Sequence, residues 1–164
     1  MSSVTTLSSS IDGHTTVQLV LDLDDGKANV YAMAGTAETT MVFPPAFQVG
    51  APFGVDIGGV NPAFVAVVAE AEYDSWLTVG VIDGSAGSAI AASPGLGLDG
   101  WTEDAAFSTN NGAVFWMSPS DGPSGRGIVM AQITSAAGRG RATADVQGKS
   151  SRGGDWTAAV QWAW

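Results

Sequence analysis

Three carboxylates stand within four positions of the chain, in the segment DLDDG. Asp22, Asp24 and Asp25 supply the oxygen ligands that Ca²⁺ prefers, and their spacing resembles the first half of an EF-hand loop. The last position of such a loop needs an acidic ligand, but Met33 occupies it. An EF-hand is therefore excluded. A loop Ca²⁺ site at these three residues stays open beside a simpler reading, a hairpin turn that uses Asp25-Gly26.

The other groups that could do acid–base chemistry are scattered. The chain has one histidine, His14, and no cysteine, so any catalytic triad or imidazole metal site would depend on that one side chain. The segment DGWTED offers Asp99, Glu103 and Asp104, but nothing in the sequence holds two carboxylates at a working separation. We therefore expect a protein that is not an enzyme and that carries no cofactor.

Composition places the chain among folded proteins. Its 164 residues are 45% hydrophobic and only 13% charged, which suits one domain with a real core. We expect a flexible, Ser/Thr-rich arm over residues 1–14, followed by a single domain over residues 15–164. No window is apolar enough to span a bilayer and no leader is evident, so we expect no membrane span. The compartment stays unknown, either the cytosol or that of a processed, mature form.

The charge is distributed unevenly along the chain. Residues 1–125 hold 14 of the 16 acidic residues and one basic residue, Lys27, whereas residues 126–164 hold five basic and two acidic residues. The acidic body disfavours nucleic acid as a partner. Arg139 and Arg141 have two interpretations: surface solubility with internal pairing, or a basic face that docks on the acidic face of another copy.

Short apolar runs bounded by Gly, Pro, Asp and Asn indicate strands. Several alternate with period two, as in TVQLVLDL, where Val17, Leu19, Leu21 and Leu23 share a face. The alanine-rich run at 63–70 is the nearest candidate for a helix, but its valines favour a strand. The expected strands cover residues 16–23, 27–35, 39–43, 63–70, 74–82, 112–117, 127–134, 141–150 and 155–164. The fold class is therefore all-β: a single antiparallel β-sandwich, jelly-roll-like, of about nine strands.

Two long loops interrupt this pattern. Residues 43–64 hold four prolines and four phenylalanines, which predicts an ordered crossover packed over one end of the sandwich, with its aromatics as plugs. Residues 84–100 form the second loop, with room for a short strand in the middle.

Aromatic residues mark the candidate binding surface. Phe115 and Trp116 are adjacent, so on a strand one side chain faces the core and the other faces elsewhere. Trp162 and Trp164 share one face of the last strand with Trp156. The candidate self-association residues are Phe115, Trp116, Arg139, Arg141, Trp162 and Trp164. An ordinary core strand is the alternative reading of the aromatic positions.

Several strings resemble a known β-domain. These are NVYAMAGT, MVFPPAFQVGAPFGVDIGGVNPAF, EYDSWLTVG, NGAVFWMSPSDGP, MAQIT and VQGKSSRGGDW. They resemble a domain that recurs in proteins of marine algae and other aquatic microbes and that is similar to the pyrenoid shell proteins of diatoms and related algae. Those proteins tile a sheet around the Rubisco compartment. The resemblance covers about residues 28–164, implies self-assembly in the plastid stroma, and transfers no catalytic residue. The chain departs from the shell proteins in showing no internal repeat.

Two functions follow as hypotheses. The first is a non-catalytic structural protein that self-assembles into an oligomer, sheet or tube, with itself as partner. The alternative is a carbohydrate-binding module that binds a glycan on Trp and Tyr platforms. The position of the tryptophans distinguishes them, because an open, flat aromatic strip favours sugar and aromatics covered between copies favour assembly.

Overall fold

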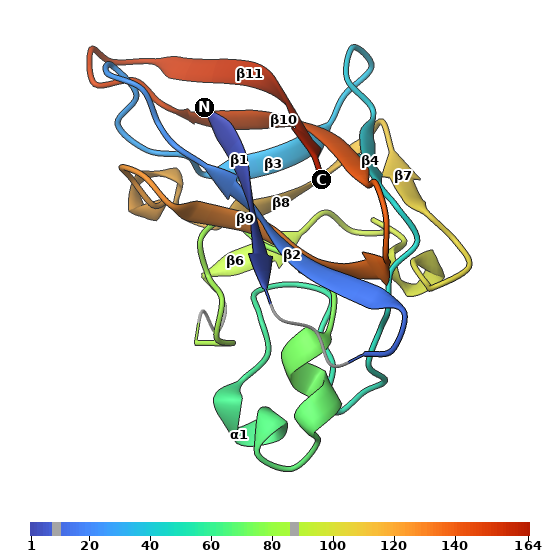
Figure 1. Ribbon diagram of the computed structural model, residues 1–164. Coiled ribbons are helices and arrows are strands. Elements are labelled where there is room, and N and C mark those ends of the chain that lie inside the picture. The colour runs from blue at the N-terminus through green and yellow to red at the C-terminus, as the bar shows by residue number, and fades with distance from the viewer. Residues whose placement is uncertain (8–10, 86–88) are drawn as a thin grey trace.

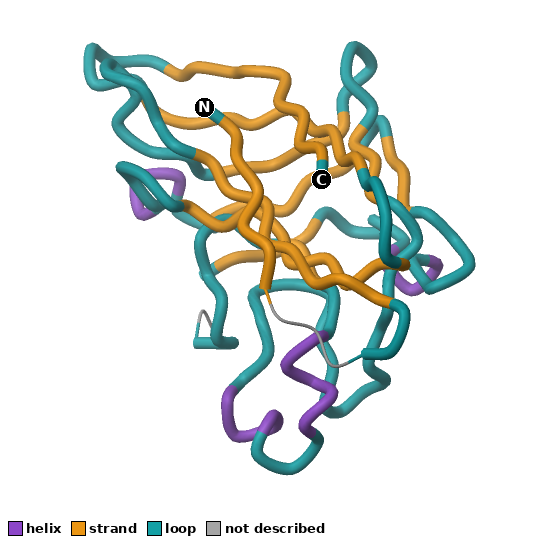
Figure 2. The backbone as a smooth tube through the Cα atoms, in the orientation of Figure 1, coloured by secondary structure: helices purple, strands orange, loops and turns teal. Residues whose placement is uncertain are grey.

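The protein is a sandwich of two antiparallel β-sheets with a small helical lobe at one end (Figures 1 and 2). The computed structural model describes residues 1–7, 11–85 and 89–164. The prediction of an all-β antiparallel sandwich is confirmed, with eleven strands in the described residues instead of about nine.

The first sheet has four strands in the order β1-β2-β9-β5. Their bounds are β1 (Ser2–Leu7), β2 (His14–Leu21), β9 (Ile128–Ala136) and β5 (Trp76–Leu77). The four alternating residues predicted to share a face of β2 and its extension, Val17 to Leu23, all join the main core. Thr16 and Gln18 lie on the opposite face, where they bond Thr134 and Gln132 of β9.

The second sheet has seven strands, and β10 is its centre. β10 pairs with β11 along its whole length on one side, and with β3 and then β4 on the other. β8 and β6 continue from β3, and β7 continues from β4, so β11 is an edge strand. The bounds are β3 (Ala32–Gly35), β4 (Met41–Phe43), β6 (Ile90–Ala92), β7 (Phe107–Thr109), β8 (Gly112–Trp116), β10 (Arg141–Lys149) and β11 (Asp155–Ala163).

The structure corrects the expectation of a flexible arm. Residues 2–7 form β1, which pairs antiparallel with β2, and His14 is the first residue of β2. Val4 packs against the main core, and the neighbouring threonines are β-branched residues that favour strands. The Ser/Thr-rich composition of the segment hid this alternation. Residues 8–10 of the expected arm lie outside the described residues, as do residues 86–88 of the second long loop.

The strand predicted over residues 63–70 is also wrong. The chain there forms a short helix, α1 (Pro62–Val65), followed by a 3₁₀ helix (Ala69–Tyr73). Asn61 starts the helix, because its side-chain oxygen accepts the N–H of Ala63 at 2.9 Å and Pro62 fits the first helical position. These helices and the preceding loop form the lobe, residues 48–75, which projects from one end of the sandwich (Figure 1).

The crossover over residues 43–64 is ordered, and one of its phenylalanines is a plug. Phe43 is buried, with its ring 5.8 Å from the ring of Trp101 and 6.3 Å from that of Phe107. Phe53 instead contacts Phe64 at the lobe, with 6.0 Å between ring centroids. Two short helices complete the fold at Leu98–Gly100 and Pro119–Asp121. Among the described residues, no helix is long and apolar enough to cross a membrane.

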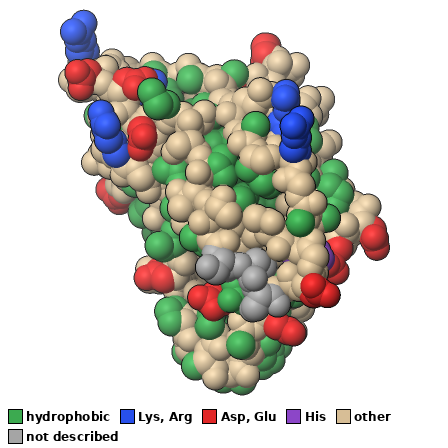
Figure 3. Space-filling model, in the orientation of Figure 1, with side chains coloured by type: hydrophobic (Ala, Val, Ile, Leu, Met, Phe, Trp, Pro, Cys, Tyr) green, Lys and Arg blue, Asp and Glu red, His purple; other side chains and the backbone are tan. Residues whose placement is uncertain are grey.

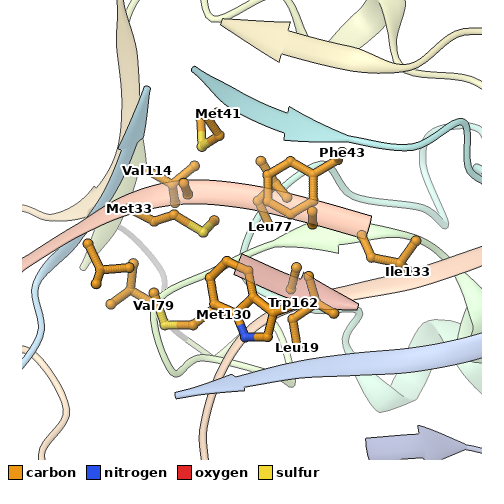
Figure 4. Close-up of a cluster of buried hydrophobic side chains, with 14 of the residues drawn as sticks. Leu19, Met33, Met41, Phe43, Leu77, Val79, Val114, Met130, Ile133 and Trp162 are labelled. Atoms are coloured by element: carbon orange, nitrogen blue, oxygen red, sulfur yellow. The ribbon is translucent and has the colours of Figure 1, made fainter. Parts of the chain in front are cut away.

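Trp162 lies in the centre of the core, between the two sheets (Figure 4). Its side chain belongs to β11 of the second sheet, and its indole N–H donates to the carbonyl of Val20 in the first sheet at 2.9 Å. The residue is only 2% exposed. Because the indole bridges the two layers, this one side chain ties the edge strand β11 to the opposite sheet.

We predict that Trp162→Ala lowers the free energy of unfolding by about 3–5 kcal/mol, because it leaves a large cavity between the sheets. Urea denaturation followed by circular dichroism measures this loss. The matched control is Ala163→Ser at the neighbouring exposed position of β11, with an expected change of less than about 0.5 kcal/mol. A loss below about 1 kcal/mol for Trp162→Ala contradicts a central role for this indole.

Candidate functional site

The adjacent aromatics of β8 point to opposite faces of the second sheet. Trp116 faces inward, packs against the core and donates its indole N–H to the carbonyl of Val79 at 2.8 Å. Phe115 faces outward, opposite Ala32 on β3 and Ala91 on β6, and is half-buried. Of these two candidate residues, Phe115 is therefore the one that a partner can reach from outside the sheet.

The C-terminal tryptophans belong to the protein's own fold. Trp162 is buried in the core, so the expectation that it docks on another copy is corrected: it cannot contact a partner while the sandwich is intact. Trp164 is half-buried, its indole lies close over Gly140, and its backbone bonds Gly140 in both directions, at 2.7 and 3.1 Å. A side chain at position 140 would collide with this indole.

The tryptophans form no open platform. Trp76, Trp101 and Trp162 are buried, and Trp116, Trp156 and Trp164 are half-buried. Four of the indole N–H groups donate to backbone carbonyls, from Trp101, Trp116, Trp156 and Trp162. These rings fill the core and hydrogen-bond the backbone. This arrangement argues against a flat strip of tryptophans that binds sugar.

Arg139 and Arg141 are exposed in the turn between β9 and β10 and at the start of β10. Two further arginines, Arg126 and Arg152, are exposed elsewhere in the C-terminal part of the chain. Within the described ranges none of the four makes an ion pair, whereas Lys27 and Lys149 pair with Asp24 and Asp155. We call these four residues the free arginines. Their lack of internal partners disfavours the simple interpretation of Arg139 and Arg141 as internal pairing residues.

Two of the three carboxylates of DLDDG have separate structural partners. Asp22 accepts the N–H of Gly127 at 2.8 Å, and Asp24 pairs with Lys27 at 3.4 Å. Gly26 adopts φ of 95°, a left-handed turn conformation that suits glycine. A search of the described residues finds no group of three or more His, Cys, Asp or Glu side chains placed to hold a metal ion. The loop Ca²⁺ site at Asp22, Asp24 and Asp25 stays a prediction.

His14 is half-buried and has an acceptor at each ring nitrogen. Its Nδ1 lies 2.8 Å from the carbonyl oxygen of Asp12, and its Nε2 lies 3.1 Å from Oε1 of Glu103. Both nitrogens therefore act as donors when the ring carries two protons, and the pair ties the start of β2 to the loop after Trp101. His14 also lines a hollow of about 300 Å³, together with Glu103 and Arg139.

A buried carboxylate holds the lobe in shape. The two oxygens of Asp74 accept the N–H groups of Val49 and Val55, at 2.8 and 2.7 Å. These bonds fasten the loop between β4 and α1 to the start of β5. Burial raises the pKa of Asp74 to about 6, and the hydrogen bonds from Val49, Val55 and Ser75 oppose that rise. The lobe is thus an ordered protrusion.

The lobe exposes a group of apolar side chains that sequence reasoning missed. Val67 is 70% exposed and Phe64 is 37% exposed, and Phe53 packs edge-on against Phe64. We call Phe53, Phe64 and Val67 the lobe tip. The signal was present in Asn61-Pro62, which starts a helix: Phe64 lies in this helix and Val67 lies in the turn that follows it.

Every charged residue of the lobe is acidic. Asp56, Glu70 and Glu72 are exposed, and residues 28–125 contain no Lys or Arg at all. Burial, and secondarily the charge of Asp99, raises the pKa of Asp56. In Figure 3 the lower lobe shows acidic but no basic side chains, and the visible Lys and Arg lie in the upper half.

An apolar groove opens between the edges of the two sheets, where β1 and β11 face each other. It has a volume of about 240 Å³, and its walls include Leu21, Val146, Trp156, Ala158 and Val160, which we call the edge groove. The Ser2 hydroxyl closes one end by donating to the carbonyl of Gln161 at 2.9 Å. At the other end the ammonium group of Lys27 lies 4.8 Å from the centre of the Trp156 ring.

A larger hollow of about 410 Å³ lies on the outer face of the first sheet, beneath the lobe. Apolar side chains line one part of it, and Gln18, Glu72, Tyr73 and Gln132 line the polar part. Gln132 is already engaged, because its amide nitrogen donates to the carbonyls of Glu72 and Asp74.

The fold and these surfaces define the class of the protein as an all-β sandwich with a lobe at one end. Searches against family models, curated proteins and solved structures find no match to this chain.

We predict that Asp74 makes stability fall as pH rises between about 4 and 6. Its raised pKa means that the native state binds more protons than the unfolded state in that range, so the contribution is present below about pH 4 and is lost as pH rises through about 6. The loss is at most about 3 kcal/mol. Urea unfolding across this pH range measures the slope.

The comparison for this slope is Asp74→Asn. Its amide nitrogen would face a backbone N–H, so the variant is less stable at every pH, and the part of the slope due to Asp74 disappears. Asp121→Asn removes an exposed carboxylate and should keep the wild-type slope. An identical slope in Asp74→Asn and wild type would show that this carboxyl group does not titrate in the range.

Proposed function

We propose that this protein is a non-catalytic structural protein that self-assembles into an oligomer, sheet or tube. The observation that carries the proposal is the separation of its surface chemistry. The apolar tip lies on a lobe whose charged residues are all acidic, and the four free arginines lie in the C-terminal part of the chain.

Such a separation favours contacts between copies. Complementary charges steer encounters and disfavour like-charged pairings. When the two complementary patches are different parts of one molecule, the contact is heterologous and leaves both kinds of patch free at the ends of the assembly. Growth into a ring or an open filament then follows from the geometry of that single contact. The resemblance to pyrenoid shell proteins agrees with this proposal and would narrow it to a shell in the plastid stroma.

A carbohydrate-binding module is the second candidate. The hollow beneath the lobe supports it, because its volume of about 410 Å³ and its mixed lining of Tyr73, Gln18 and Glu72 suit a small polar ligand. The lack of an exposed tryptophan strip makes it the weaker candidate. Glycan-array binding that is lost in Tyr73→Ala would favour it over assembly.

We expect the chain to elute as particles larger than its 16.6 kDa monomer in size exclusion with light scattering, with regular particles under negative stain. A monomer that persists at high concentration would sink the assembly proposal.

We also predict that Arg139→Gln with Arg141→Gln weakens assembly, most strongly at low salt, because salt screens exposed charges. The matched control, Ser108→Glu with Ser120→Glu, makes the same change in net charge at two exposed sites outside the turn between β9 and β10. If both double variants weaken assembly equally, net charge and not a local patch is responsible. Light scattering across a salt series provides the measurement.

A further inference from the structure

The chemistry of the lobe tip suits a partner surface that is apolar and positively charged. Val67 and Phe64 are the two large hydrophobic residues of the lobe that are exposed, and they stand on a protrusion held by the buried Asp74. The lobe also carries the exposed carboxylates of Asp56, Glu70 and Glu72, and none of the three makes an ion pair within the part of the chain that the structure describes. Rigid apolar groups that are already in place bind with little loss of conformational entropy.

Two kinds of partner fit this tip poorly. A second lobe tip would bring carboxylates against carboxylates, and such like-charge contacts cost several kcal/mol. An anionic lipid surface is attracted by basic residues, and the lobe has none. The partner must therefore differ from the lobe and carry positive charge.

The edge groove of another copy meets both requirements. Its apolar side chains lie beside the polar residues Ser2, Lys27 and Gln161, and in Figure 3 hydrophobic side chains lie between two groups of basic side chains in the upper half of the molecule. Its volume of about 240 Å³ is below the usual range of about 300–1,000 Å³ for small-molecule sites. The groove therefore suits one or two protein side chains better than a free ligand.

The backbone of β11 leaves bonding groups free along this groove. Trp164 and Gly140 exchange both of their backbone hydrogen bonds, so in the antiparallel ladder the even-numbered residues of β11 bond β10. The N–H and C=O groups of Thr157, Ala159, Gln161 and Ala163 point away from β10. The carbonyl of Gln161 receives the Ser2 hydroxyl, and the groups of Thr157 and Ala159 flank the open part of the groove.

We propose that the lobe tip of one copy inserts into the edge groove of the next, with the acidic side chains around the tip facing the free arginines. This contact rests on the proposed function and specifies its geometry. It joins two different surfaces, so each copy presents one tip and one groove, and the assembly grows head to tail.

A complementation experiment tests this contact. Val67→Asp puts a charge on the exposed tip, and Ala159→Glu with Gln161→Glu puts charges at exposed positions on the rim of the groove. Each variant alone should associate at least roughly 30-fold more weakly than wild type, the loss expected for a residue central to an interface. Each should therefore run as the 16.6 kDa monomer. An equimolar mixture should form a dimer and stop there, because one variant keeps its groove and the other keeps its tip.

The control is Met117→Asp, which adds the same charge at another exposed hydrophobic residue, 62% exposed and outside both surfaces. It should assemble as wild type does. Circular dichroism establishes that each variant is folded, and Phe64→Ser replaces Val67→Asp if that variant is not.

The other outcomes separate the two proposals. A monomeric wild type overturns the proposed function and this contact with it. Assembly of wild type and of both variants alike overturns the contact and leaves the proposed function standing. Two monomeric variants whose mixture stays monomeric overturn the head-to-tail pairing. Sedimentation of wild type, but not Val67→Asp, with phosphatidylcholine vesicles, with assembly unchanged, would reassign the tip to lipid.

Discussion

The hydrogen bond between the indole of Trp162 and the carbonyl of Val20 joins the two layers of this protein at β11, the edge strand of its sheet. β11 is the edge of its sheet, and the Ser2 hydroxyl of β1, the edge strand of the other sheet, donates to the carbonyl of Gln161 on β11. Without a disulfide, the edge strand depends on what its inward side chains bury. Trp162 supplies the largest share of that burial on β11, and the shape of the edge groove beside it follows from the same anchoring.

A second constraint acts at the opposite end of the molecule. The lobe packs on the first sheet through a small hydrophobic cluster of Val60 and Ala71 with Trp76 of β5 and Val129 of β9. A cluster of this size contributes little stability. The two carboxylate oxygens of Asp74 stabilise the lobe further, because they accept hydrogen bonds from two N–H groups of its loop. The same buried carboxylate that keeps the tip rigid also makes its stability sensitive to pH.

The two ends of the molecule differ in surface charge. Residues 28–125 contain no Lys or Arg. In a fold that interleaved these residues with the rest of the chain, the surface charge would still be even. Here the chain places the lobe from its middle third at one end and the free arginines of its last third elsewhere, so an uneven sequence becomes an uneven surface. A surface of this kind suits contacts between different faces of identical copies.

The sequence by itself determined the fold class and which side chains of a long strand share a face, because successive side chains of a strand alternate with period two. Val17 to Leu23, along β2 and its extension, and Trp156 to Trp162 on β11 could be grouped in this way. It also determined the charge asymmetry, because the acidic and basic residues of each part of the chain can be counted directly.

Tertiary structure alone decided which aromatics are exposed. In the sequence, Trp162 and Phe115 are equally good candidates for contact with a partner. Their burial depends on which strand packs across the sandwich, and no local pattern carries that information. The helix at Pro62 replaced the predicted strand because a cap at Asn61 outweighed the strand preference of the valines. The lobe tip and the edge groove bring together residues far apart in sequence, so only the folded chain could reveal them.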